Sequence, residues 1–224
     1  MSIGQALAEL LFPTRCFLCR TKTGGEALCP SCRARWEQDK LSGKTERHPL
    51  RGVDTLCYLS AYSPNPNHAV SAYLRRAKRD YRKTAVQFAA REAAALLQRS
   101  ADEVWRNVLV TYVPRSCRAV VRFGFDQSAL LAEQIAAELG AECMCLLYHM
   151  GNTKQKTLMR EERGRNAVRA YHVLPKAASF VTGRRILLVD DVVTTGATAS
   201  ACALCLREEG CAEVTVFSMA RVRK

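Results

Sequence analysis

The chain has 224 residues, of which 48% are apolar, and its 34 Lys and Arg residues against 21 Asp and Glu give a formal charge of +13. The apolar fraction excludes a disordered chain, and no stretch approaches the roughly 18 consecutive apolar residues of a membrane span. The charge does not bear on the fold, but it predicts attraction to polyanions such as nucleic acid or phosphorylated metabolites.

The first residues do not show the pattern of a secretory signal. The stretch Met1–Pro13 has no basic start and no small-residue cleavage site, and its spaced apolar residues favour a short amphipathic helix. Eleven cysteines without such a signal favour reduced thiols or metal ligands over a disulfide scaffold. We therefore expect a soluble protein of the cytoplasm.

Four cysteines form two Cys-x-x-Cys pairs, Cys16 with Cys19 and Cys29 with Cys32. A pair on a tight turn supplies two thiolates, and two such knuckles can close over one tetrahedral Zn²⁺ ion as a structural site. A redox dithiol is the alternative, but it normally opens a helix after a strand, which neither pair does. We expect the remaining cysteines to be packing residues: Cys57, Cys117, Cys143, Cys145, Cys202, Cys205 and Cys211.

The polar segment Glu37–Gly52 is typical of a linker, and it divides the chain into an N-terminal module (1–50) and a larger domain (51–224). In the larger domain, apolar runs of strand length alternate with helical patterns. The expected strands are Leu56–Tyr62, Val108–Val113, Cys143–Tyr148, Arg185–Asp190 and Val214–Met219, and the expected helices are His68–Arg79, Thr84–Arg99, Gln127–Leu139 and Ala197–Glu209. This alternation predicts an α/β fold with a mainly parallel sheet flanked by helices, and ligands beyond the carboxyl ends of the strands.

The stretch Ile186–Thr198 reads Ile-Leu-Leu-Val-Asp-Asp-Val-Val-Thr-Thr-Gly-Ala-Thr. It predicts a buried strand that ends on two carboxylates, a turn of small hydroxyl residues and glycine, and the start of a helix. Such a turn offers backbone N–H groups, hydroxyls and a helix dipole to a phosphate, and the carboxylates can accept hydrogen bonds from a sugar diol. The alternative is a helix capped by Thr194 or Thr195, which leaves both carboxylates unexplained.

These thirteen residues match the signature of type I phosphoribosyltransferases, and the whole chain resembles the ComF family, which combines that fold with an N-terminal four-cysteine zinc module and is associated with DNA uptake in natural transformation. The resemblance implies that Asp190 and Asp191 hold the ribose hydroxyls of phosphoribosyl pyrophosphate, with Mg²⁺. It further implies that the 5-phosphate is wrapped by Thr194, Thr195, Gly196, Ala197 and Thr198. It leaves open whether the chain transfers the phosphoribosyl group to an acceptor, a step for which Asp191 is the candidate catalytic residue.

Other positions carry the same resemblance. The turn Val113–Arg118, with Val113, Pro114, Arg115 and Arg118, matches the loop that approaches the pyrophosphate, and Lys78 matches a family lysine. The roles of Arg160, Arg163 and Asn166, in a further family motif, do not follow from the sequence. Tyr112-Val113-Pro114 and Phe123-Gly124-Phe125-Asp126-Gln127 depart from the family pattern, which puts turnover in doubt more than binding.

Two basic clusters exceed the need of one small ligand. Residues 74–83 hold six basic residues and one acidic, interleaved with Tyr73 and Tyr81, and Lys154–Arg169 holds six basic and two acidic. A solvated helix face is one explanation. The other is a surface for single-stranded DNA or for the DNA-uptake machinery, on which arginines follow the backbone and tyrosines stack on bases, so that the chain is a non-catalytic accessory factor. The four histidines lack ligand spacing, and we expect them to be structural or surface residues.

Overall fold

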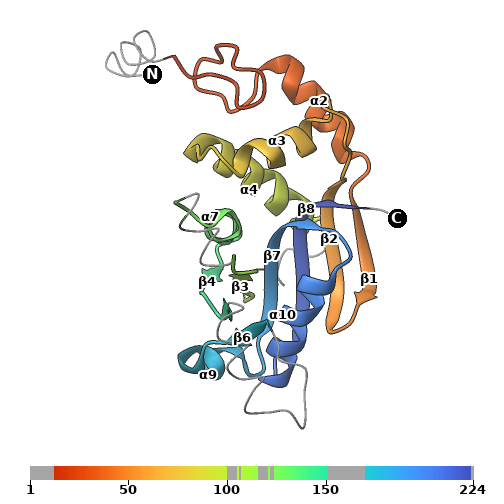
Figure 1. The fold of residues 1–224 in the computed structure, drawn as a ribbon, viewed down its shortest axis with the longest axis vertical. Coiled ribbons are helices and arrows are strands. Elements are labelled where there is room, and N and C mark those ends of the chain that lie inside the picture. The colour runs from red at the N-terminus through yellow and green to blue at the C-terminus, as the bar shows by residue number, and fades with distance from the viewer. Residues whose placement is uncertain are drawn as a thin grey trace.

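A six-stranded sheet in the order β1-β2-β8-β7-β3-β4 forms the centre of the molecule, for which the computed structural model describes residues 13–99, 105, 107–115, 121, 124–150 and 170–222 (Figure 1). Its strands are β1 (Lys44–Leu50), β2 (Val53–Ala61), β3 (Leu109–Tyr112), β4 (Glu142–Cys143), β7 (Arg185–Val193) and β8 (Glu213–Arg221). β1 pairs antiparallel with β2, and every other neighbouring pair is parallel. The predicted mainly parallel sheet is therefore confirmed.

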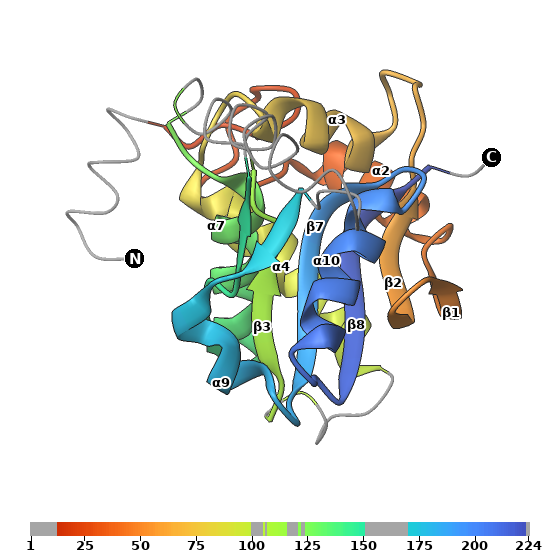
Figure 2. The same ribbon diagram turned by 60° about the horizontal axis from the view of Figure 1, so that its bottom comes forward.

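Helices cover both faces of this sheet (Figure 2). The helices α4 (Lys83–Gln98) and α7 (Gln127–Leu139) pack on one face, and α10 (Ala197–Glu208) and α9 (Ala178–Val181) pack on the other. Side chains alternate along each strand, so one core takes Leu187, Val189 and Phe217 and the other takes Ile186, Leu188 and Val216. The apolar runs of the central strands follow from burial on both sides.

One predicted strand is divided in the structure. Cys143–Tyr148 was expected to be continuous, but β4 ends at Cys143, and β5 (Leu147–His149) pairs antiparallel with β6 (Tyr171–Val173) in a separate two-stranded sheet. The chain leaves the large sheet where the N–H of Met144 donates to the Val110 carbonyl at 2.9 Å and that of Leu146 to the Thr111 hydroxyl at 3.3 Å. The apolar residues of Cys143–Tyr148 do not by themselves indicate that the chain turns away from the large sheet within this segment.

The prediction of an irregular linker over Glu37–Gly52 is wrong. Residues 37–40 are the last turn of α2 (Pro30–Lys40), and residues 44–50 are β1. Trp36 of α2 is buried against the rings of Tyr73 and Phe88, with centroids 5.6 and 4.9 Å away, in the core that also covers the sheet. The division of the chain into residues 1–50 and 51–224 stays a prediction.

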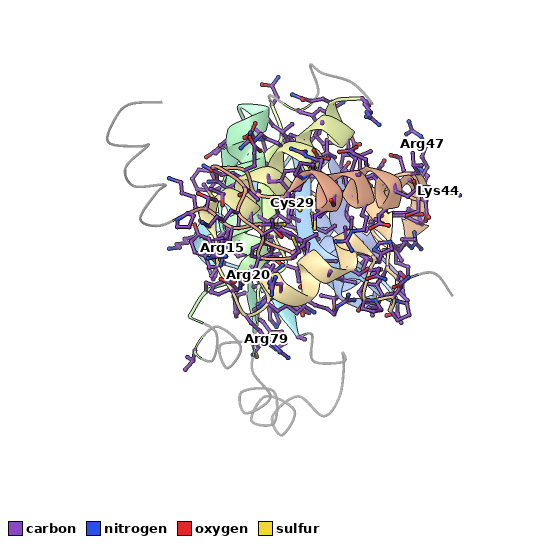
Figure 3. The ribbon with its side chains drawn as sticks, turned by 90° about the horizontal axis from the view of Figure 1, so that it is seen from above. Arg15, Arg20, Cys29, Lys44, Arg47 and Arg79 are labelled. Carbon is purple, nitrogen blue, oxygen red and sulfur yellow. The ribbon has the colours of Figure 1, made fainter. Side chains whose placement is uncertain are left out.

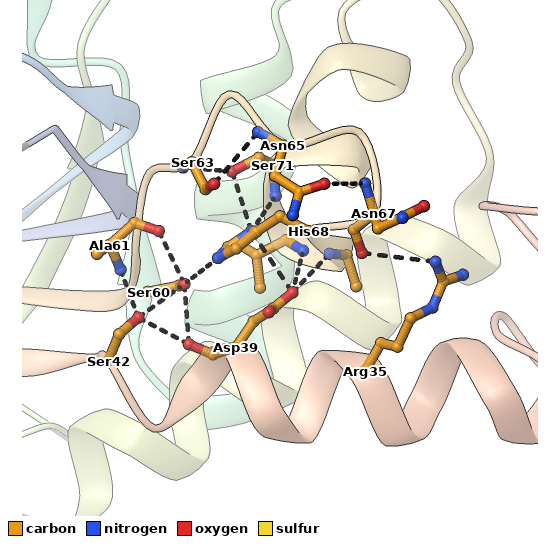
Figure 4. Close-up of polar contacts among 12 residues, drawn as sticks. Arg35, Asp39, Ser42, Ser60, Ala61, Ser63, Asn65, Asn67, His68 and Ser71 are labelled. Carbon is orange, nitrogen blue, oxygen red and sulfur yellow. Dashed lines mark hydrogen bonds and ion pairs between the residues drawn. The ribbon is translucent and has the colours of Figure 1, made fainter.

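A polar network fastens α2 to α3 (Ala69–Ala77) (Figure 4). The carboxylate of Asp39 accepts the backbone N–H groups of Ala69 and Val70 at the start of α3. His68 caps the same helix, since its Nδ1 accepts the N–H of Ser71 at 3.2 Å, while its Nε2 lies 3.4 Å from the Ser60 hydroxyl. His68 is thus a structural residue, as predicted. The network holds α3 across the end of the sheet where β8 runs out to the C-terminus (Figure 2).

Candidate functional site

The four N-terminal cysteines converge on one point. The Sγ atoms of Cys16, Cys19, Cys29 and Cys32 lie within 4.8 Å of one another, although the sequence separates them into two knuckles. The first knuckle is closed by backbone hydrogen bonds from Cys16 N–H to the Thr21 carbonyl at 2.7 Å and from Arg20 N–H to the Cys16 carbonyl at 3.0 Å. Cys29 then precedes Pro30, the first residue of α2. The second pair therefore opens a helix, contrary to the expectation from the sequence, although a turn and not a strand leads into it.

The environments of these thiols differ. Hydrogen bonds with Thr21 lower the pKa of Cys19 to about 6, and burial raises the pKa of Cys32 to about 12. The guanidinium Nη2 of Arg35 donates to the Cys32 sulfur at 3.0 Å, a role that the sequence analysis missed because the i, i+3 contact requires the helix. Four sulfur donors in one closed cluster are the set that a structural Zn²⁺ prefers, so the residues present fit this ion.

The two adjacent carboxylates lie within β7 and on opposite faces of the sheet. The prediction that this strand ends at Asp190 is wrong, because β7 continues to Val193 by pairing with β8. Asp191 continues the row of Leu187 and Val189, whereas Asp190 continues the row of Ile186 and Leu188 and lies near Cys202 of α10. Asp190 is only 9% exposed, and its Oδ1 accepts the backbone N–H of Asp191 at 2.8 Å. Burial, followed by the neighbouring charge of Asp191, raises the pKa of Asp190 to about 7.

Two predicted cations meet Asp191 from separate elements. The Nζ of Lys78, at the end of α3, lies 3.9 Å from Asp191 Oδ2, and the Nη2 of Arg115, after β3, lies 3.4 Å from the same oxygen. The Arg115 side chain is 16% exposed and that of Asp191 is 17% exposed. The structure thus brings together Lys78, Arg115 and Asp191, three residues that the sequence resemblance had named.

Asp126 and Gln127 hold Arg115 in place. Asp126 caps α7 by accepting the N–H groups of Ser128 and Ala129, and its other oxygen accepts the N–H of Arg115 at 3.0 Å. The side-chain oxygen of Gln127 accepts from Arg115 Nη2 at 2.9 Å. The departure at Asp126 therefore has a structural role here, and an Asp just before a helical pattern is the signal that identifies such a cap.

The loop between β7 and α10 has the geometry of an uncapped helix start. Thr194, Thr195, Ala197 and Thr198 are exposed, and no side chain caps α10, whose N-cap residue is Gly196 at φ +82°. A capping role for Thr194 or Thr195 is thus wrong, and the hydroxyl of Thr195 instead accepts the N–H of Ala197 at 3.3 Å. A Cβ at Gly196 would lie 2.3 Å from a methyl of Leu50, which would have to move, and φ +82° is a conformation that strongly favours glycine.

The predicted pyrophosphate loop is described as far as Arg115. The N–H of Val113 donates to the Val189 carbonyl at 2.9 Å, so Val113 and Pro114 continue directly from the sheet beside β7. Arg118 lies outside the described residues, as do Cys117, the N-terminal helix predicted within Met1–Pro13 up to residue 12, and the cluster Lys154–Arg169 with Arg160, Arg163 and Asn166.

Between the first zinc knuckle and α3 runs an open groove of about 510 Å³, which is lined by Leu18, Arg20, Pro66, Ala72, Arg75, Arg76, Arg79 and Asp80. Arg15, Arg20 and Arg79 lie on one side of the molecule, whereas Lys44 and Arg47 lie on another (Figure 3). The basic cluster at residues 74–83 was predicted to present Tyr73 and Tyr81 for stacking on bases. This is wrong for Tyr73, which is buried, whereas Tyr81 is 48% exposed and its ring contacts Phe125.

The cysteines outside the cluster are packing residues for the most part. Cys57, Cys202, Cys205 and Cys211 are buried, as predicted. Cys145 is exposed, so its prediction as a packing residue is wrong. It lies in the turn between β4 and β5, where the chain leaves the large sheet and no longer alternates between its faces.

Comparisons with known proteins find similarity to a zinc-binding family and to two kinds of bacterial protein. Residues 7–42 match the double zinc ribbon domain family, which with the four-cysteine cluster supports a structural zinc site. The DNA utilization protein YhgH of Salmonella typhi is 34% identical over 115 residues, which cover 50% of this chain and 48% of that protein. Competence protein F of Haemophilus influenzae is 31% identical over 102 residues, which cover 45% of this chain and 44% of that protein. The matches thus span about half the length of these relatives.

Two solved structures are also similar. The allosteric regulatory enzyme of purine biosynthesis has a TM-score of 0.40 and 24% identity, over 60% of this chain and 26% of that one. Glutamine phosphoribosylpyrophosphate amidotransferase from B. subtilis has a TM-score of 0.39 and 22% identity, over 72% of this chain and 29% of that one. Within the described part of the chain, no helix has the length and apolar character needed to cross a membrane. The zinc ribbon match and the competence and DNA-utilization relatives fit the ComF family, as the sequence resemblance predicted.

Proposed function

We propose that the chain binds phosphoribosyl pyrophosphate with Mg²⁺ at the carboxyl end of β7, and that it serves DNA uptake from the cytoplasm. The observation that carries the ligand assignment is the meeting of Lys78 and Arg115 at Asp191, near the end of the strand that leads into the Thr-Thr-Gly-Ala-Thr loop and α10. The names of the relatives, a competence protein and a DNA utilization protein, support the biological role.

Each part of the ligand has a matching group in this proposal. The 5-phosphate is bound by the loop Thr194–Thr198, where the start of α10 supplies N–H groups and the positive end of its dipole. Asp190 and Asp191 accept hydrogen bonds from the ribose hydroxyls. Lys78 and Arg115, with Arg118, neutralise the pyrophosphate. The oxygens of the pyrophosphate and of the carboxylates are the ligands that Mg²⁺ prefers.

If the phosphoribosyl group is transferred, pyrophosphate leaves the anomeric carbon through an oxocarbenium-like state. The contribution of the chain is then to hold the sugar in position and to stabilise the leaving charge with fixed cations. In this proposal Asp191 contacts the ribose in that step. Its two cationic neighbours fix the orientation of its carboxylate before the ligand arrives.

Calorimetric titration with phosphoribosyl pyrophosphate and Mg²⁺ tests the binding proposal. We expect binding by the wild type, a loss of affinity of tenfold or more, about 1.4 kcal/mol, in Asp191→Ala, and no change in Glu133→Ala, which removes an exposed carboxylate of α7. Unchanged affinity in the double variant Asp190→Ala with Asp191→Ala would refute the assignment. A pyrophosphate-release assay over candidate acceptors then separates turnover from binding alone.

A second candidate function is the binding of single-stranded DNA, and the arginine-lined groove beside α3 favours it. Phosphate contacts of this kind are sequence-tolerant and weaken steeply with salt. We expect Arg79→Glu to lower the affinity for an oligonucleotide about tenfold and to reduce its salt dependence. Lys44→Glu is the matched control, because Lys44 is exposed on β1 away from the groove (Figure 3). No binding at low salt, or equal loss in both variants, would refute this function.

A further inference from the structure

Arg76 joins the first zinc knuckle to α3. Its Nη1 donates to the backbone carbonyl of Phe17 at 2.6 Å and to that of Leu18 at 2.7 Å. Both residues lie between Cys16 and Cys19, and one nitrogen can reach two consecutive carbonyls only if the chain turns between the cysteines. The contact therefore depends on the folded knuckle, which is the part that a structural metal stabilises.

Other contacts along the same seam keep the knuckle against α3. The rings of Phe17 and Tyr73 pack with centroids 5.2 Å apart, and both side chains are buried. Beyond α3, Asp80 forms an ion pair with Arg20 at 2.7 Å, and Arg82 donates to the Arg15 carbonyl at 3.2 Å. The end of α3 and the turn after it are thus attached to both ends of the first knuckle.

Lys78 follows Arg76 by two residues and faces the opposite way. Residues at i and i+2 of a helix point to different sides, so Arg76 contacts the zinc module while Lys78 approaches Asp191 at 3.9 Å. The carbonyl of Arg76 also accepts the N–H groups of Arg79 at 2.9 Å and Asp80 at 3.0 Å, which closes the last turn around Lys78. A shift of Arg76 would therefore move the lysine at the sugar-phosphate site.

We infer that Arg76 is a positioning residue through which the zinc knuckle and the ligand site at Asp191 are coupled. Zinc keeps the knuckle folded, the knuckle carbonyls hold Arg76, and the last turn of α3 places the Lys78 ammonium beside Asp191. Because coupling between two binding sites is reciprocal, a ligand at Asp191 also raises the affinity of the knuckle for zinc. We expect this gain in affinity to appear as slower zinc release. The inference rests on the proposed function for the identity of the ligand, phosphoribosyl pyrophosphate.

The test measures zinc release from the full, zinc-loaded chain to a coloured chelator, with and without phosphoribosyl pyrophosphate and Mg²⁺. For the wild type we expect the ligand to slow release about fivefold, the lower end of typical coupling. Arg76→Met should abolish this effect and Arg76→Lys should restore part of it, since the ammonium can still donate to both carbonyls. Arg91→Met, which removes an exposed guanidinium from α4, should behave as the wild type.

Lys78→Met tests the coupling from its other end and leaves every contact to the knuckle intact. We expect zinc release without ligand to match that of the wild type. The ligand, at a concentration that titration shows to saturate this variant, should lose its effect on release. This variant keeps the test decisive if Arg76→Met does not fold. Equal slowing by the ligand in Lys78→Met or in Arg76→Met and in the wild type would overturn the inference.

Hydrogen exchange separates this inference from the proposed function. If the wild type does not bind phosphoribosyl pyrophosphate, the proposed function fails, but the link from zinc to α3 can still be measured. We expect zinc removal to increase amide exchange at Arg79 and Asp80, whose N–H groups are bonded to Arg76, and Arg76→Met to raise it without zinc removal. Exchange at these amides that does not respond to zinc would overturn the inference.

Discussion

Asp190 should destabilise the ligand-free protein at neutral and higher pH. Its carboxyl is buried within β7 and lies beside Asp191, and these two causes raise its pKa from 3.8 to about 7. A raised pKa in the folded state means that stability is greatest below the unfolded pKa and falls as the pH rises towards the folded pKa. At about 1.4 kcal/mol per pH unit, the cost reaches about 4 kcal/mol at pH 8.

The substitution Asp190→Asn removes this cost with little change of shape. The side-chain oxygen can still accept the N–H of Asp191, but the new amide N–H groups need partners, which offsets part of the gain. We expect the free energy of unfolding to rise by about 2 kcal/mol at pH 8. The gain should disappear at pH 5, where the cost in the wild type is smaller by about 2 to 3 kcal/mol.

Urea unfolding of the zinc-loaded protein at pH 5 and pH 8 measures this difference, with Glu133→Gln as an exposed control on α7. The same Asp190→Asn variant should bind phosphoribosyl pyrophosphate more weakly, because a neutral amide is a poorer acceptor for ribose hydroxyls than a carboxylate. A stabilisation that is equal at the two pH values, or a loss of stability at pH 8, would refute the reasoning.

Three further predictions concern the rest of the structure. Elemental analysis should find one zinc per chain. Cys29→Ser should lose this zinc and lower the free energy of unfolding, because zinc binding at a structural site contributes to folding; a full zinc content in this variant would contradict the cluster. Burial lowers the pKa of His68 below 6.5, so the free energy of unfolding should fall as the pH drops through that lowered value. In urea titrations, His68→Asn should flatten this pH dependence, because asparagine does not titrate but can still cap α3. Gly196→Ala should lower the melting temperature and abolish ligand binding, because its Cβ meets Leu50 and φ is +82°; wild-type affinity would show that the loop adapts.

The parts of the site that a short stretch of sequence encodes could be predicted from it. The strand, carboxylates, loop and helix start at Arg185–Thr198 follow from an apolar run, a turn composition and a helical pattern in direct succession. The two cysteine knuckles are equally local. In contrast, the contact of Arg76 with Phe17 and Leu18 joins segments far apart in the chain, and no local pattern of charge distinguishes Arg76 from Arg75 or Arg79.

Two errors share a physical origin in how polar and apolar residues are distributed. β1 (Lys44–Leu50) has the sequence of a linker because it is an edge strand, and mostly exposed edge strands are commonly charged and tolerate proline. Tyr73 lies beside a run of arginines in the sequence, but the helical period places Tyr73, Leu74 and Ala77 in the core and leaves Arg75 and Lys78 exposed.

The position of β1 also decides how the chain can be divided. A chain shortened to residues 51–224 would lose the strand that pairs with β2, and the backbone of Val53–Ala61 would become a free sheet edge with an apolar sequence. Such edges pair with other molecules, so we expect the shortened chain to aggregate rather than to fold as a monomer. It would also lack Leu50, which lies against the phosphate loop at Gly196. A zinc ribbon exchanged between relatives would therefore have to carry β1 with it.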